Sequence, residues 1–161
     1  MFQGHEGGLF VKKQTIMKDF ILKTSNDWPG LILRLTAGFI MLPHGLQKLV
    51  GMFGGYGFKA SMDYFTNTLK LPWLISVLVI LVECFGAIGL IAGVLTRIWA
   101  AAFIVVMIGA MVTTNAKNGL FMNWYGNQSG EGCEYHLLLI GICIALLITG
   151  GARFSVDSQL Q

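Results

Sequence analysis

The stretch L-P-W-L-I-S-V-L-V-I-L-V-E-C-F-G-A-I-G-L-I-A-G-V-L, residues 71–95, decides the class of fold. It carries a single ionised side chain, that of Glu83. Because a helix of about 20 mostly apolar residues crosses the ~30 Å of a bilayer's hydrocarbon, the stretch predicts a membrane span. The composition agrees, since 55% of the 161 residues are hydrophobic and 12% are charged. Ordinary soluble domains carry about 25% charged residues.

Three further apolar segments accompany this span. The four segments together predict an all-α membrane protein, a four-transmembrane-helix bundle. The predicted spans cover residues 29–50, 72–95, 97–116 and 134–149 of a membrane domain over 28–157. An N-terminal arm over 1–27 precedes the domain, and a tail over 158–161 follows it. The arm is polar and mixed in charge, so a cleavable signal peptide is not expected.

The basic residues predict the orientation. With four spans, both termini and the turn at residues 95–97 share one side of the membrane. That side holds six basic residues, Lys12, Lys13, Lys18, Lys23, Arg97 and Arg153, and the other side holds four, Lys48, Lys59, Lys70 and Lys117. The positive-inside rule therefore places both termini in the cytoplasm. The formal charge of +3 is scattered, which excludes the clustered basic face of a nucleic-acid-binding protein.

Ionisable groups inside the first two spans need an explanation, because charges in hydrocarbon are costly and usually face a partner or a wet cavity. They are Arg34, His44, Lys48 and Glu83. On a regular helix Lys48 points about 40° away from both Arg34 and His44, so the three share one face. At about 1.5 Å rise per residue, Arg34 and Glu83 differ in depth by only ~6 Å. We therefore predict a buried Arg34–Glu83 ion pair.

The outer half of the bundle is predicted to hold a polar pocket. His44 and Lys48 lie level with the start of the fourth span, E-Y-H at residues 134–136. Imidazoles exchange protons near neutral pH, so both histidines and Glu83 are candidate proton carriers. The candidate ligand-binding residues are Arg34, His44, Lys48, Glu83, Glu134 and His136. The alternative is that these groups only tie the helices together through hydrogen bonds.

The three cysteines do not form a C-x-x-C pair, so neither a zinc site nor any other metal site is expected. Cys84 and Cys143 lie in apolar runs and are expected to pack as small hydrophobic residues. Cys133 lies in a polar loop, where reaction or pairing with another chain stays open.

The first outer loop contains a helical pattern. Phe58, Met62, Phe65 and Leu69 recur at helical spacing. The pattern predicts a short helix that either lies on the membrane surface or packs over the outer mouth of the bundle.

The chain contains three elements in the order H-G-x-x-K, E-x-x-x-x-x-G-L and G-x-R-x-S-x-D. With the runs around them, from Leu31 to Asp157, they resemble the DoxX family of small bacterial membrane proteins. The resemblance implies a four-helix bundle in the bacterial inner membrane and a role near redox chemistry. Relatives include a subunit of a thiosulfate:quinone oxidoreductase, and others are associated with oxidative or thiol stress. The family's polar signature matches Arg34, His44, Gly45, Lys48, Glu83, Arg153, Ser155 and Asp157.

Three functions fit these patterns. The first is a redox-associated subunit that binds a quinone or similar ring. Because the chain has no dinucleotide fingerprint and no paired cysteines, any electrons would come from the ligand or from a partner, either a second oxidoreductase subunit or a soluble redox enzyme. The second is a module, as a homo-oligomer, that binds or transports a small anion or aromatic compound. The third is a scaffold that recruits soluble redox enzymes to the bilayer. Haem is not expected, because His44 and His136 belong to no haem-attachment motif.

Overall fold

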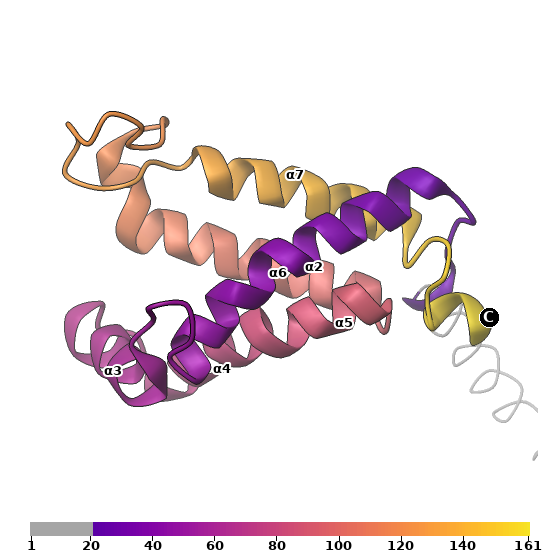
Figure 1. Ribbon diagram of the computed structural model, residues 1–161, viewed down its shortest axis with the longest axis horizontal. Coiled ribbons are helices and arrows are strands. Elements are labelled where there is room, and N and C mark those ends of the chain that lie inside the picture. The colour runs from indigo at the N-terminus through magenta and orange to yellow at the C-terminus, as the bar shows by residue number, and fades with distance from the viewer. Residues whose placement is uncertain (1–20) are drawn as a thin grey trace, which may run out of the picture.

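The computed structural model describes residues 21–161, and every regular element within this range is helical (Figure 1). Four helical segments run the length of the molecule. They are α2 (Trp28–Leu49), the continuous segment α4 (Trp73–Leu81), η2 (Val82–Gly86) and α5 (Ala87–Ala92), the segment α6 (Thr96–Ala110), η3 (Met111–Asn115) and η4 (Ala116–Asn118), and α7 (Glu134–Thr149). The first three segments are long and apolar enough to cross a membrane, and α7, with 16 residues, is shorter. The predicted all-α bundle is confirmed. Residues 1–20 of the predicted N-terminal arm, with Lys12, Lys13 and Lys18, lie outside the described residues.

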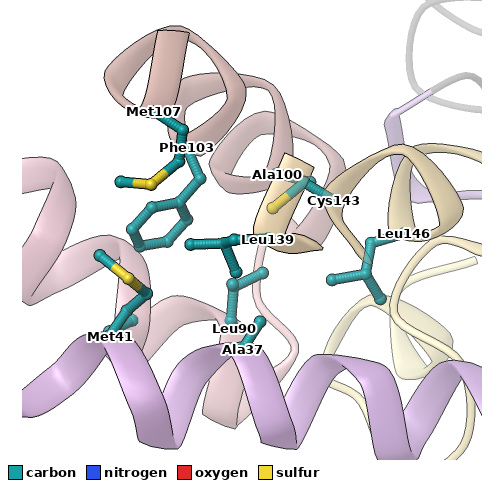
Figure 2. Close-up of a cluster of buried hydrophobic side chains, with 10 residues drawn as sticks. Ala37, Met41, Leu90, Ala100, Phe103, Met107, Leu139, Cys143 and Leu146 are labelled. Carbon is teal, nitrogen blue, oxygen red and sulfur yellow. The ribbon is translucent and has the colours of Figure 1, made fainter. Parts of the chain in front are cut away.

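The bundle has two distinct ends, which we name the inner and the outer end after the orientation that the basic residues predict. The inner end holds the start of α2, the turn between α5 and α6, and the docked C-terminal segment over residues 150–161 (Figure 1). At the outer end, α2 finishes at Leu49, and the loop over residues 119–133 and the short helix α3 (Gly57–Asp63) lie there too. Between the two ends, side chains of four helices fill the middle of the molecule, as Figure 2 shows; they include Ala37, Met41, Leu90, Phe103, Met107, Cys143 and Leu146. Cys143 packs in this core as expected, and Cys84 is buried as well.

The outer helix packs against the bundle. α3 continues into a π-helical turn, η1 (Tyr64–Thr68), and Met62 and Phe65 are buried together with Ile80 of α4. Leu69 is partly buried against this cluster, whereas Phe58 is exposed. Of the two arrangements that the sequence left open, the structure supports the packed one.

The start of α2 is set by Asp27. Its carboxylate accepts hydrogen bonds from the Gly30 amide at 2.6 Å and from the Ser25 hydroxyl, and Pro29 lies in the first turn, where a missing N–H costs nothing. These two hydrogen bonds lower the pKa of Asp27, because they favour its charged form.

A pH prediction follows from Asp27. Its folded-state pKa is lowered, so the stabilisation is present above the unfolded pKa of about 3.9 and is lost as the pH falls through the folded pKa. We expect the melting temperature of the wild type to fall more between pH 7 and pH 3 than that of Asp27→Asn, whose amide does not titrate. Parallel pH profiles of the two proteins would contradict this role.

Candidate functional site

A lysine–glutamate pair connects α2 and the second helical segment near the outer end. Lys48 Nζ forms an ion pair with Glu83 Oε2. The Glu83 side chain is 7% exposed, whereas that of Lys48 is 28% exposed. Glu83 lies in η2, a π-helical turn inside an otherwise α-helical span, and such turns often mark functional sites.

Gly45 makes the pair geometrically feasible. A Cβ atom at position 45 would lie 2.5 Å from both Cα and N of Cys84, so the backbones of α2 and η2 are in direct contact. This contact brings the helices close enough for Lys48, one turn further along α2, to reach Glu83.

The Gly45 contact gives a prediction. Gly45→Ala must push α2 away from η2, and overpacking of this kind costs about 1–3 kcal/mol. We expect a lower melting temperature in detergent, by roughly 2–4 °C for each kcal/mol in a chain of this size. Gly141→Ala is the matched control, because no atom lies within 4 Å of its added Cβ. Equal melting temperatures of the two variants would disprove the tight contact.

The predicted Arg34–Glu83 pair is wrong. The Arg34 guanidinium instead donates to the carbonyl oxygens of Leu90 at 2.8 Å and Ile91 at 2.6 Å, at the end of α5. The physical reason is that helical side chains lean toward the N-terminus of their helix. In α2 this direction takes Arg34 toward the inner end, away from Glu83, and brings Lys48 back toward Glu83.

Arg34 belongs to a group at the inner end that we call the C-terminal clasp, formed by Arg34, Ser155 and Asp157. All three are buried. Arg34 also donates to the carbonyl oxygens of Arg153 and Phe154, both at 3.3 Å. The Asp157 carboxylate accepts from the amides of Leu95 at 2.7 Å and Thr96 at 2.9 Å, which caps the start of α6. These contacts favour a structural role for Arg34.

The two predicted histidines flank Tyr135 of α7. The His44 ring lies 6.0 Å from the Tyr135 ring, and the His136 ring lies 5.7 Å from it. The Tyr135 hydroxyl donates to Met41 Sδ at 3.1 Å. These contacts bring His44 of α2 and His136 of α7 to the same tyrosine. His136 Nδ1 is buried without a hydrogen-bond partner among residues 21–161.

Glu134, at the start of α7, contacts the second outer loop. Its carboxylate accepts from the Met122 amide of that loop at 3.2 Å. Its predicted role in ligand binding stays a prediction. Cys133, directly before it, is 6% exposed, which argues against reaction or pairing with another chain.

A cleft of about 600 Å³ adjoins the ion pair at the outer end. One wall is α3 and η1, and the other is the glycine-rich loop after α2, held by a hydrogen bond from Gln47 Nε2 to the Phe53 carbonyl at 3.1 Å. Its lining includes Lys48, Ser61, Tyr56, Tyr64 and Phe65. The three aromatic residues and Tyr135 were missed by sequence reasoning, although the G-G-Y-G run and the tyrosine in E-Y-H are visible signals.

The fold and the site define a small polytopic membrane protein with a buried charged pair beside an outer cleft. The chain belongs to the DoxX family, whose model matches residues 30–116. Over 127 residues it is 29% identical to a protein of Bacillus subtilis (strain 168) named "Putative oxidoreductase CatD". The aligned region covers 79% of this chain and 83% of that relative. No solved structure matches the chain.

Proposed function

We propose that this protein is a subunit of a bacterial inner-membrane oxidoreductase system, and that it binds a quinone or a similar ring compound in the cleft beside Lys48. The name of the Bacillus subtilis relative supports the redox association. The observation that carries the proposal is the position of Lys48, which lines the cleft and also pairs with buried Glu83.

The Lys48 ammonium can donate a hydrogen bond to an oxygen of a bound ring compound. An ammonium has three N–H donors, and the bond to Glu83 uses one of them. The others can donate to a quinone carbonyl, while Tyr64 and Phe65 offer faces against which a ring packs. Because Glu83 neutralises Lys48, the cleft suits an uncharged ring better than an anion. This balance weighs against the anion-binding alternative.

The same residues can supply protons. Reduction of a quinone to a quinol takes up two electrons and two protons. The Lys48 ammonium would deliver one proton to a ring oxygen and regain a proton from water for the second, and the ionised Glu83 carboxylate would stabilise the recharged lysine. The electrons would come from a partner, either a second oxidoreductase subunit or a soluble redox enzyme.

The proposal is tested on protein purified in mild detergent, by mass spectrometry of extracted small molecules and by an absorbance spectrum. We expect a stoichiometric ring compound in the wild type and its loss in the double variant Lys48→Met, Glu83→Gln, which removes both charges together. Lys59→Met is the control, because Lys59 is an exposed lysine of α3 that does not line the cleft. If the double variant retains the compound, or if the wild type yields none even after incubation with a benzoquinone, the proposal fails.

A further inference from the structure

The cleft lies at the level where the bilayer's hydrocarbon ends. Lys48 follows Trp28 by 20 residues of one helix, which corresponds to about 30 Å at 1.5 Å per residue. This length equals the ~30 Å thickness of the hydrocarbon core. If Trp28 marks the inner boundary, Lys48 therefore lies at the outer one. Trp73, which begins α4 at the same end, is exposed, as expected of an aromatic side chain at the water–lipid boundary.

The segment over residues 50–58, which contributes Gly54, Gly55 and Tyr56 to one wall of the cleft, is unusually apolar for a surface segment. Between residues 50 and 58, the exposed side chains include Val50, Met52, Phe53, Tyr56 and Phe58. Tyr56 is 88% exposed and Phe53 is 62% exposed. Contact with water would be unfavourable for this surface, at about 25 cal/mol per Å², and contiguous apolar patches of this kind mark contacts with lipid or protein. Tyrosine at the rim favours lipid, because its ring suits the headgroup region.

Passage toward the inner end is closed. The buried core in Figure 2 fills the middle of the bundle with Met41, Phe103 and Met107, and the C-terminal clasp packs the inner end. A ligand of the cleft must therefore enter and leave at the outer end.

From these observations we infer that the cleft opens sideways into the outer leaflet of the membrane and takes its ligand from the lipid phase. The ligand class is an uncharged, lipid-soluble ring compound with an oxygen acceptor for Lys48. The ligand class in this inference rests on the proposed function. The direction of the opening rests on the apolar side chains of residues 50–58 and on the depth of Lys48 in the membrane.

The test uses the full-length protein in lipid nanodiscs and a hydrophobic aryl diazirine, which labels side chains on illumination. Labelled residues are mapped by mass spectrometry, with and without aqueous glutathione to scavenge the probe from water. Val105 and Ile148, exposed on α6 and α7, serve as lipid-facing references. We expect labels on Tyr56 and Tyr64 that survive glutathione as the references do. A decyl-benzoquinone competitor should reduce these labels several-fold and leave the references unchanged.

A pair of variants controls for the position of the probe. Ala60→Trp fills the cleft from exposed Ala60 of α3 and should reduce the label on Tyr64. Thr68→Trp, an exposed position of η1 that does not line the cleft, should leave it unchanged.

The outcomes separate the two proposals. The sideways opening is overturned if the references stay labelled but Tyr56 and Tyr64 lose their labels with glutathione. It is also overturned if Tyr56 and Tyr64 are never labelled. Protection by the competitor without glutathione would then still support ring binding. Labels that survive glutathione and fall with Ala60→Trp but ignore the competitor leave the opening intact and overturn the ring ligand, and with it the proposed function. A Tyr64 label that ignores Ala60→Trp does not come from the cleft and overturns the opening.

Discussion

Lys48→Met is expected to destabilise the bundle more than Glu83→Gln does. Removal of Lys48 leaves the Glu83 carboxylate, 7% exposed, without its counter-ion. Loss of one partner of a buried pair costs about 3–5 kcal/mol. Glu83→Gln instead leaves an ammonium whose long side chain is 28% exposed and can turn outward to the headgroups. The cost of losing Glu83 should therefore be the smaller one.

The double variant Lys48→Met, Glu83→Gln provides the decisive comparison. Because it leaves no unpaired charge, we expect it to be more stable than Lys48→Met alone. The measurement is the midpoint of thermal unfolding, monitored by circular dichroism, with all variants in the same detergent at the same pH. Additive losses in the double variant would show that the two side chains do not depend on each other. A lower midpoint for Glu83→Gln than for Lys48→Met would show that the unpaired ammonium is the costlier of the two charges.

Arg34→Met is expected to have the other large effect, a loss of folded protein. The Arg34 side chain is 1% exposed and donates to four backbone carbonyl oxygens in two segments of the chain. A buried acceptor left without a donor costs about 1–3 kcal/mol. The Leu90 carbonyl keeps the bond from the Gly93 amide at 3.2 Å, whereas the carbonyls of Ile91, Arg153 and Phe154 lose a donor. The loss is then a large part of the about 5–15 kcal/mol that stabilises a typical protein.

Arg153→Met is the matched control for Arg34→Met. The Arg153 guanidinium lies 4.6 Å from the ring centroid of Trp28 at the surface of the inner end, and an exposed contact of this kind is worth about 0.5–1 kcal/mol. Carboxypeptidase digestion reports on the clasp directly. We expect residues 150–161 to be removed rapidly from Arg34→Met and slowly from Arg153→Met and the wild type. Equal digestion of the two variants would show that Arg34 does not hold the C-terminal segment.

The candidate site was only partly visible in the sequence. The unusual composition of the first two spans identified Lys48 and Glu83, because a charge in a predicted span stands out without any knowledge of packing. Their pairing was not predicted, since depth along each helix was used without the direction in which side chains lean. Tyr56, Tyr64 and Phe65 were not predicted as site residues, because the cleft forms only where the loop after α2 meets α3 and η1.

The sequence by itself determined the class of the protein. Its long apolar runs leave a helix as the structure that satisfies every backbone hydrogen bond in lipid, so the all-α bundle follows from composition and length alone. The tertiary structure decided the partners of the buried charges. Arg34 closes the inner end and Lys48 meets Glu83, because the contact at Gly45, the π-helical turn at Glu83 and the docked C-terminal segment set distances that no single helix contains.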